Sequence, residues 1–567
     1  MLEKIQKPND IKKIPADQLP ALAEEIREFI IESLSKTGGH LASNLGVVEL
    51  TIAMHRVFDL PKDKLIWDVG HQSYTHKILT GRKDGFETLR REGGISGFPK
   101  RSESDCDVFD TGHSSTSISA GVGYVRAREL KKENYSVVSI IGDGALTGGM
   151  AYEALNNAAS LKSNFIIVLN DNEMSITENV GGMSSYLSGL RTASAYTDFK
   201  MDVTKALNRI PGIGPGMVDA MRKTKSSIKQ IIIPGMLFED MGLTYLGPVD
   251  GHNIPQLIKT FQEAKRFEGP ILVHVLTQKG RGYEPAMRHP ARFHGAGPFD
   301  VKTGLPVGKS NPTYTDVFST VMRKMGDRRK DVAAVTAAMM TGVGLKRFSN
   351  MFPDRCFDVG IAEEHAVTFA AALSLGGITP VVAIYSSFLQ RAYDQIMHDV
   401  CMQNLHVVFA IDRAGLVGYD GETHHGIFDL SYLGSMPNMT ILSPATLDQL
   451  EYMLDFAINK FNAPIAIRYP RGGTEAENVP SAFTLGQAQC IQNGSDVTII
   501  ATGRMVKRAE EVAKLTTKSV EILAMPTIKP LDTKSIIDSA KKTGSVITIE
   551  DNVKIGGMGS MIGTLLE

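Results

Sequence analysis

Two short apolar runs on either side of a Gly-rich turn constrain the fold of this chain more than any other feature. Residues 137–141 and 165–169 show no regular alternation of polar and apolar side chains, which is typical of buried parallel strands. The segment between them, residues 152–159, favours a helix. A right-handed crossover of this kind brings the carboxyl ends of both strands to one edge of a sheet, where open α/β folds bind ligands.

Oxygen-bearing side chains follow both predicted strands. Asp143 lies in Gly142-Asp143-Gly144 after the first strand, and Asn172 closes an Asn-Asp-Asn run after the second. Mg²⁺ prefers carboxylate, amide and phosphate oxygens, and glycines let backbone N–H groups approach a phosphate near a helix N-terminus. The spacing therefore predicts that Asp143 and Asn172 meet at a site for a metal and a diphosphate. The alternative is a tight turn followed by an Asx turn, without a ligand.

Composition narrows the class of protein. A chain of 567 residues is too long for one core, and its net charge of −1 argues against a general nucleic-acid-binding protein. The four cysteines show no CxxC pair and no finger spacing, so zinc and disulfides are not expected and a reducing cytoplasm is the predicted location. The N-terminus lacks the apolar core of a secretory signal, and the longest apolar-rich run, residues 366–385, is broken by Gly376-Gly377 and Pro380, so neither a secretory signal nor a transmembrane segment is expected.

The distribution of linkers predicts three successive α/β domains with mostly parallel sheets. Residues 300–312 are rich in Gly, Pro and Lys, as linkers are, and a second break falls within 475–489. The predicted domains are therefore 1–308, 313–477 and 486–567. The last one stops inside a predicted helix, so we expect it to be incomplete. Residues 183–227 follow no clear pattern and are interpreted as a surface excursion, with a mobile flap as the alternative.

Three histidines occupy similar positions in the first predicted domain. His40, His71 and His113 each follow a glycine in a loop that precedes a predicted helix. Any one of them alone would more often be a structural residue, but three such loops indicate a shared site. Lys279 and Arg281 follow a later predicted strand and suit a phosphate, although a solvated pair is the alternative.

The Gly-Asp-Gly motif, followed by 27 residues and Asn172, resembles the cofactor signature of thiamine-diphosphate enzymes. The resemblance implies that Asp143, the Asn172 side chain and the Met174 backbone carbonyl hold Mg²⁺. It also implies a set of residues that bind the cofactor: His71, Gly112, His113, Ser114, Gly144, Ala145, Asn172, Tyr283, Glu363 and Phe388. It further implies that the two predicted domains at the N-terminal side share the thiamine-diphosphate-binding fold, and that the third resembles a transketolase C-terminal domain.

An acid in the second predicted domain suits this cofactor. The aminopyrimidine ring needs a carboxyl group at N1′, and such a group works best in an apolar pocket that raises its pKa. Glu363 precedes a dense run of small and apolar residues, 366–375. Its neighbour Glu364 is the competing candidate, and either could be a helix N-terminal acid without further role. In the family that the chain resembles, the motif Ile-Ala-Glu places the functional acid at Glu363.

Several polar residues of the second domain are candidates for substrate binding. Arg413 and Arg471 follow predicted strands, and two guanidinium groups suit a phosphate monoester. The resemblance implies that Phe388 stacks on the pyrimidine, and it implies further substrate-side groups: Tyr385, Arg391, Asp420 and His424. The implied catalytic residues are Glu363, His40, His71 and His424.

The motifs in order resemble the 1-deoxy-D-xylulose-5-phosphate synthase family along nearly the whole chain. They include TGGHLASNLGVVEL, DVGHQSYTHKILTGR, GHSSTSISAG, IAEEHAVTFAA, YSSFLQRAYDQ and DRAGLVGYDGETHHG. The resemblance implies a homodimeric transferase that uses thiamine diphosphate and Mg²⁺ to condense pyruvate with glyceraldehyde 3-phosphate. The segment PAMRHP after Tyr283 departs from the family pattern, so residues 287–289 receive no role. The alternatives are a transketolase, which uses a ketose donor, and a non-catalytic scaffold that binds metal and nucleotide.

Overall fold

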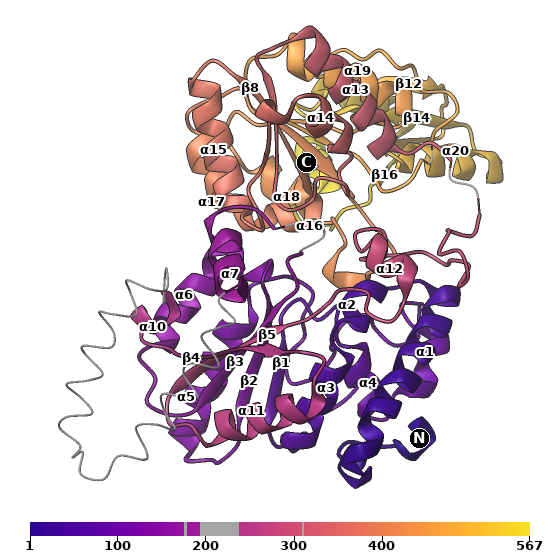
Figure 1. Cartoon of the computed structure of the whole chain (residues 1–567). Helices are drawn as coiled ribbons and strands as arrows, with labels where there is room; N and C mark the ends of the chain where they lie inside the picture. Colours follow the sequence, from indigo (N-terminus) through magenta and orange to yellow (C-terminus); the bar gives the residue numbers. More distant parts are fainter. Residues whose placement is uncertain (175–178, 193–236, 309–310, 474) are drawn as a thin grey trace, which may run out of the picture. The chain divides into compact units, whose positions relative to one another are not determined.

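The computed structural model describes residues 1–174, 179–192, 237–308, 311–473 and 475–567, which form two compact units (Figure 1). The units are Met1–Gly308 and Lys309–Glu567. Most of the stretch 183–227, predicted as a surface excursion, lies outside the described residues; its first part is the helix α7 (Gly182–Thr192). Within the described part of the chain, no helix is both long enough and apolar enough to cross a membrane.

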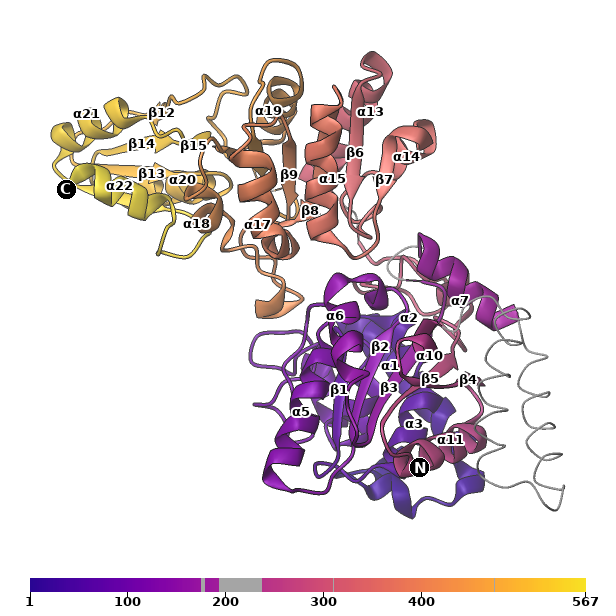
Figure 2. The same ribbon diagram turned by 90° about the vertical axis from the view of Figure 1, so that its left-hand side faces the viewer.

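The first unit is built on a sheet of five parallel strands (Figure 2). Their order is β1 (Lys64–Trp67), β2 (Val137–Gly142), β3 (Phe165–Asp171), β5 (Pro270–Leu276) and β4 (Thr244–Asp250). The predicted strands at 137–141 and 165–169 are confirmed, and α6 (Gly149–Ala158) is the predicted helix between them. Because the strands run in parallel, their carboxyl ends lie at one edge.

Helices cover both faces of this sheet. One face packs on α5 (Ser117–Lys131) and α6, through side chains such as Ile118 and Leu155. The other face packs on α3 (Val48–Val57) and α11 (Ile254–Arg266), through side chains such as Leu50 and Phe261. Since side chains of both faces are buried, the strands need no polar alternation, which explains the apolar runs in the sequence.

Further helices of the first unit pack outside this core. The helix α1 (Leu19–Thr37) is amphipathic, and Leu19, Leu22, Ile26 and Ile30 on its apolar face are all fully buried. Four other α-helices among the described residues of this unit are short: α2 (Leu41–Leu45), α4 (Tyr74–Leu79), α10 (Leu237–Asp240) and α12 (Glu284–Arg288).

The second unit contains a larger and a smaller sheet. The larger has the order β15 (Thr527–Lys529), β10 (Thr440–Leu442), β11 (Ile465–Arg468), β9 (Val408–Asp412), β8 (Thr379–Tyr385), β6 (Val332–Thr336) and β7 (Cys356–Asp358). All neighbours are parallel except β15, which is antiparallel to β10. Its main helices are α13 (Tyr314–Arg328), α14 (Lys346–Met351), α15 (Glu363–Leu375), α18 (Asp429–Gly434) and α19 (Leu447–Asn459).

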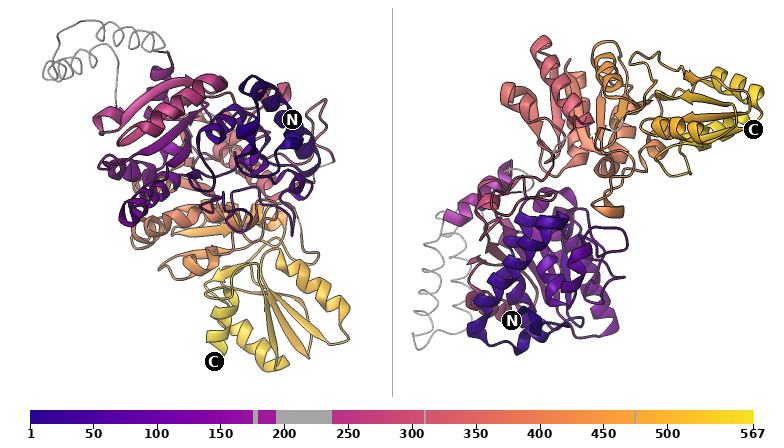
Figure 3. Two further views of the ribbon diagram at one scale, coloured as in Figure 1. Left: turned by 90° about the horizontal axis from the view of Figure 1, so that it is seen from below. Right: turned by 90° about the vertical axis from the view of Figure 1, so that its right-hand side faces the viewer.

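The smaller sheet has four strands and is coloured yellow in Figure 3. The order is β12 (Gln489–Gln492), β14 (Val520–Ala524), β13 (Val497–Ala501) and β16 (Val546–Ile549), with only β12 antiparallel among these described strands. Its helices are α20 (Met505–Leu515), α21 (Thr533–Thr543) and α22 (Met558–Leu566). The predicted α/β class with mostly parallel sheets is confirmed, whereas the domain limits 1–308, 313–477 and 486–567 stay predictions.

Candidate functional site

Asp143 and Asn172 lie together at the carboxyl edge of the first unit's sheet. Gly142 at the end of β2 pairs with Asn170 in β3, so the residues that follow the two strands are neighbours. Asn172 N donates to Asp143 Oδ2 at 3.3 Å, and Asn179 Nδ2 donates to the same oxygen at 2.9 Å. The expectation that the two predicted metal ligands meet is confirmed; their role as ligands stays a prediction.

The surroundings of Asp143 fit a bound cation. Burial and the neighbouring charge of Asp171 raise the pKa of Asp143 well above its usual range, and a metal would stabilise its charged form. Among the described residues, no three His, Cys, Asp or Glu side chains are grouped to hold a metal. A cation at Asp143 would therefore need amide, carbonyl and phosphate oxygens as further ligands, which is the preference of Mg²⁺.

The loop that carries Asn172 adopts the Asx turn that was the alternative interpretation. Asn172 Oδ1 accepts a hydrogen bond from Met174 N at 3.1 Å. This bond uses one lone pair of the amide oxygen and leaves the other available to a ligand. At the end of the neighbouring strand β2, a Cβ added to Gly142 would meet nothing within 4 Å, so no packing requirement of the described residues explains this glycine. Turn geometry and ligand binding are therefore compatible here.

Asp171, which precedes Asn172 and has no role predicted from the sequence, also stabilises this loop. Its Oδ2 lies 2.8 Å from His274 Nε2, and His274 Nδ1 lies 2.7 Å from Tyr245 OH. Arg191 of α7 donates to Asp171 Oδ1 at 2.5 Å. Although burial raises the pKa of Asp171, the hydrogen bond from His274 holds it below its usual value. The middle position of Asn-Asp-Asn, at the end of a buried strand, was the available signal.

Two of the predicted histidines, His40 and His71, form a cluster with His294. The ring centres of His40 and His71 are 5.6 Å apart, and His294 lies 6.0 Å from His40 and 5.1 Å from His71. Lys279 Nζ is 3.4 Å from His294 Nδ1, and burial lowers the pKa of Lys279 to about 8. His294 was not predicted from the sequence; its signal was a histidine in the Gly-rich segment HGAG. The three imidazole rings can donate and accept protons, and the Lys279 amino group lies beside one of them.

The loop of His113 is tied to the other loops of the same edge. Ser115 N and Ser117 N donate to the two carboxylate oxygens of Asp68 at 2.7 and 3.0 Å. Ser115 Oγ donates to Ala145 O at 2.7 Å. These bonds join the loops after β1, before α5 and after β2, so they hold the predicted cofactor residues that directly precede Ser115 beside Ala145: Gly112, His113 and Ser114. Asp68 was missed because one acid after a strand has many structural uses.

Tyr283 lies in an aromatic cluster of the first unit. Its hydroxyl donates to Val301 O at 2.7 Å, and its ring packs edge-on against Phe293, with ring centres 5.7 Å apart. The phenol is thus held by the protein, and the predicted contact of Tyr283 with the cofactor stays a prediction.

Glu363 is the first residue of α15 in the second unit and is only 3% exposed. Its Oε2 has no hydrogen-bond partner among the described residues; Arg391 Nη1 is 3.8 Å away. Burial raises the pKa of Glu363 to about 7. The competing acid Glu364 is exposed. A carboxyl group that hydrogen-bonds the aminopyrimidine N1′ needs a free oxygen and a raised pKa, and Glu363 has both.

The predicted substrate residues of the second unit lie at the carboxyl ends of β8, β9 and β11 and in the loops that follow these strands. Phe388 has its ring centre 5.6 Å from that of Tyr385 and 5.3 Å from that of His424. The Arg413 guanidinium lies over the Tyr385 ring at 3.9 Å, and Arg471 lies over the Tyr419 ring at 5.4 Å. Asp420 precedes the short turn Gly421–Thr423, which leads into His424.

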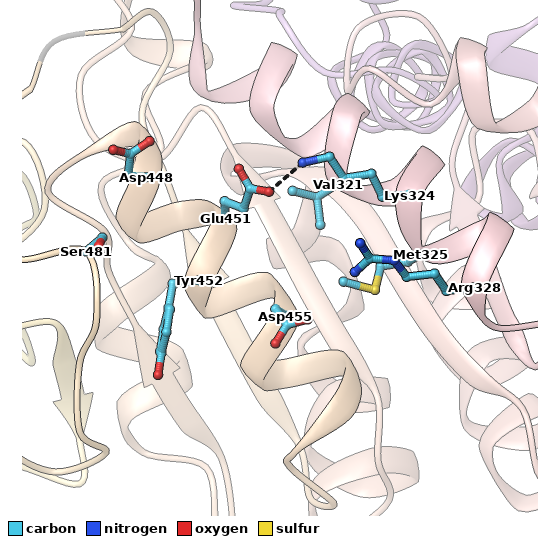
Figure 4. A pocket seen from close by; sticks show the side chains of 9 residues that line it. All are labelled: Val321, Lys324, Met325, Arg328, Asp448, Glu451, Tyr452, Asp455 and Ser481. Carbon is cyan, nitrogen blue, oxygen red and sulfur yellow. Dashed lines mark hydrogen bonds and ion pairs between the residues drawn. The ribbon is translucent and has the colours of Figure 1, made fainter.

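A separate pocket lies between α13 and α19 of the second unit (Figure 4). It has a volume of about 330 Å³ and is lined by Val321, Lys324, Met325, Arg328, Asp448, Glu451, Tyr452, Asp455 and Ser481. Lys324 and Glu451 point toward one another, with Nζ 2.7 Å from Oε1. Acidic and basic side chains face each other here, and no predicted site residue is among the lining residues.

Comparison with known proteins decides the family. A family model described as 1-deoxy-D-xylulose-5-phosphate synthase matches residues 2–277. A 1-deoxy-D-xylulose-5-phosphate synthase of Lachnoclostridium phytofermentans is 54% identical over 573 aligned residues, which cover 100% of this chain and 91% of that protein. The chain belongs to the 1-deoxy-D-xylulose-5-phosphate synthase family. A second such protein, 1-deoxy-D-xylulose-5-phosphate synthase 1 of Geobacter sulfurreducens, is 53% identical and covers 100% of this chain and 90% of its own.

The second unit matches two further models. Residues 310–475 match the pyrimidine-binding domain of transketolase, and residues 486–567 match the transketolase C-terminal domain. A solved transketolase from Leishmania mexicana aligns with 95% of this chain and 91% of its own at 16% identity and a TM-score of 0.39. Membership of the 1-deoxy-D-xylulose-5-phosphate synthase family implies dependence on thiamine diphosphate. Within the first unit, the open space at Gly142 leaves room for a diphosphate. Within the second unit, the buried Glu363 Oε2 lacks a hydrogen-bond partner among the described residues, which suits a pyrimidine nitrogen.

Proposed function

We propose that this chain condenses pyruvate with glyceraldehyde 3-phosphate, which releases CO₂ and gives 1-deoxy-D-xylulose 5-phosphate for isoprenoid, thiamine and pyridoxal biosynthesis. The observation that carries the proposal is the 54% identity to a 1-deoxy-D-xylulose-5-phosphate synthase across the entire chain. The buried carboxyl of Glu363, which keeps an unsatisfied oxygen, supports it from the structure.

The first unit would hold the diphosphate end of the cofactor and its metal. Asp143, the Asn172 side chain and the Met174 carbonyl would bind Mg²⁺, because they combine a carboxylate with neutral oxygens at one sheet edge. Backbone N–H groups at Gly144 and Ala145 would face the phosphates. His71, Gly112, His113, Ser114 and Tyr283 would complete the binding site. Asp68 would keep the His113 loop in place through its two backbone hydrogen bonds.

Glu363 would hold or share a proton at the pyrimidine nitrogen N1′. Its pKa of about 7 leaves it partly protonated at neutral pH, which suits proton exchange. When bound, thiamine diphosphate supplies a carbanion equivalent and an electron sink for decarboxylation. Phe388 would stack on the pyrimidine face.

The second unit would bind the acceptor aldehyde. Arg413 and Arg471 would bind the phosphate monoester, and stacking on the Tyr385 ring would orient the Arg413 guanidinium. Tyr385 and Arg391 would line the acceptor site, and Asp420 and His424 would contact the sugar hydroxyls. His40, His71 and His424 would transfer protons to and from substrate oxygens. Arg391 would also set the charge near Glu363.

We infer that the enzyme acts as a homodimer in the cytoplasm, in keeping with a composition without cysteine pairs and with a net charge near zero. Sedimentation at several protein concentrations tests the homodimer.

The reaction is tested by a pyruvate assay with and without added thiamine diphosphate. We expect CO₂ release that requires the cofactor, Mg²⁺ and glyceraldehyde 3-phosphate together. Turnover with ketose phosphates alone would instead support the transketolase alternative. Absence of thiamine-diphosphate binding by calorimetry in the presence of Mg²⁺ would contradict the assignment of Asp143 and Asn172.

A further inference from the structure

The loop of residues 413–426, which follows β9, carries three proposed substrate groups: Arg413, Asp420 and His424. Two backbone hydrogen bonds close its base, from Gly415 N to Gly426 O at 2.7 Å and from Gly426 N to Gly415 O at 2.8 Å. The side chains at the tip are exposed or half-buried. The position of the tip therefore depends on what holds the base.

Two residues that follow strands of the smaller sheet, Arg504 and Asp551, contact the base of this loop. Arg504, after β13, donates from Nη2 to Leu416 O at 2.9 Å. Asp551, after β16, lies so close to the loop that a Cβ on Gly415 would stand 1.9 Å from Asp551 Oδ2. Arg504 Nε is 3.0 Å from that same Asp551 oxygen. Because β13 and β16 are parallel neighbours, the carboxyl edge of this sheet receives the loop at the place where α/β sheets commonly bind ligands.

Asp551 also reaches the segment that carries Arg471. Arg468, at the end of β11, has its Nη1 3.0 Å from Asp551 Oδ1 and its Nε 2.9 Å from Asp429 Oδ2. Arg468, Asp429 and Asp551 are all buried. Removing one member of such a buried ionic group leaves an uncompensated charge. A chain of alternating charges from Asp429 to Arg504 thus connects both proposed phosphate-binding segments to the smaller sheet.

We propose that Arg504 and Asp551 are positioning residues for the phosphorylated aldehyde. They fix the backbone at Gly415 and Leu416. Arg413 is then already placed for the substrate phosphate and His424 for the substrate hydroxyls, so the loop does not have to be ordered on binding. This inference rests on the proposed function, because it requires the phosphate monoester to bind at Arg413 and Arg471. It gives the smaller sheet a part in affinity for the acceptor.

The first test is Arg504→Ala, since the Arg504 side chain is 19% exposed and its loss leaves the Arg468–Asp551 pair intact. The substitution removes the charge-assisted hydrogen bond from Arg504 to Leu416 O. We therefore expect the KM for glyceraldehyde 3-phosphate to rise by about tenfold or more. The Kd of thiamine diphosphate and the KM for pyruvate stay unchanged. Arg504→Lys restores part of the loss. The control is Arg508→Ala in α20, the helix that begins directly after Arg504; Arg508 pairs with Glu511 at the surface.

The second test separates positioning from a general loss of structure. Arg504→Ala and Asp551→Asn are assayed with glyceraldehyde, which lacks the phosphate, and we expect a much smaller loss than with the phosphorylated aldehyde. Equal losses with both acceptors, or an unchanged KM for glyceraldehyde 3-phosphate, would overturn the proposal. If Arg413→Ala and Arg471→Ala also left that KM unchanged, the proposed phosphate site itself would be wrong.

Discussion

Arg391 Nη1 lies 3.8 Å from Glu363 Oε2, near enough for attraction and too far for a hydrogen bond. Oε2 has no hydrogen-bond partner among the described residues. A buried polar atom in this state costs stability, and in native proteins it requires an explanation such as an unfilled ligand contact or a catalytic role. Glu363 is therefore a carboxyl whose partner is expected from outside the chain.

Glu363→Gln tests this role. The amide keeps the shape of the side chain and cannot exchange the proton at N1′, so we expect turnover to fall by roughly 10²–10⁴-fold. Calorimetry should still show thiamine-diphosphate binding in the presence of Mg²⁺. The exposed neighbour gives the matched control, Glu364→Gln, which should keep its activity. A non-catalytic scaffold would lose nothing in either variant, and that result would contradict the proposed reaction.

The buried carboxyl also predicts how stability depends on pH. The ordinary pKa of this group is 4.5, and burial raises the pKa of Glu363 to about 7. Between these values the folded chain holds a proton that the unfolded chain has released, so the free energy of unfolding falls as pH rises. The loss is complete above pH 7 and amounts to at most about 3 kcal/mol. Without cofactor, Glu363→Gln should therefore be more stable than the wild type at pH 8 and equally stable at pH 4.

Denaturation of the two proteins at pH 4, 6 and 8 measures this difference. Glu364→Gln should follow the wild type at every pH. A stability gain of Glu363→Gln that is the same at pH 4 and pH 8 would show that the carboxyl charge is not its cause.

Much of the fold was predictable because its signals are local. Parallel strands buried on both faces leave apolar runs, so the strands at 137–141 and 165–169 were found from short windows of sequence. The pairing of β15 with β10 was not predicted. It depends on a strand of three residues, Thr527–Lys529, that leaves its own segment to join a distant edge, and nothing within those residues encodes the partner.

The site was predictable where chemistry and a strand end coincide. Asp143 and Asn172 meet because parallel pairing of β2 and β3 aligns their carboxyl ends. The supporting residues were missed: Asp68, Asp171, His274 and His294. Each acts through a backbone amide or another side chain that is distant in sequence, so its role appears only after folding.

The two asparagines of the Asn-Asp-Asn run make a matched pair for testing the metal site. Asn170 Oδ1 accepts from Thr277 Oγ1 at 2.6 Å, whereas Asn172 Oδ1 accepts from the nearby Met174 N at 3.1 Å. Loss of an outer partner typically weakens metal binding 10–100-fold, so loss of a direct ligand in Asn172→Ala should cost at least about tenfold. Mg²⁺ titration with thiamine diphosphate present measures it.

Asn170→Ala removes a side chain that already has a protein partner, and it should lower thermal stability more than metal affinity. If Asn170→Ala weakened Mg²⁺ binding more than Asn172→Ala, the ligand would be assigned to the wrong asparagine.

Lys279 predicts a conflict between stability and binding. Burial lowers its pKa from 10.5 to about 8, so below pH 8 the folded chain carries a buried ammonium at a cost of up to about 3 kcal/mol. Between pH 8 and 10.5 the unfolded chain binds the extra proton, and the free energy of unfolding of the wild type should rise with pH. Lys279→Met should be more stable than the wild type at pH 7 and should lack this rise.

The same variant should bind thiamine diphosphate more weakly, since it removes a cation from the edge that holds Asp143 and the histidine cluster. Lys302→Met, at an exposed position of the same unit, is the control for both measurements. A variant at Lys279 that gained stability and kept full cofactor affinity would remove this lysine from the diphosphate site.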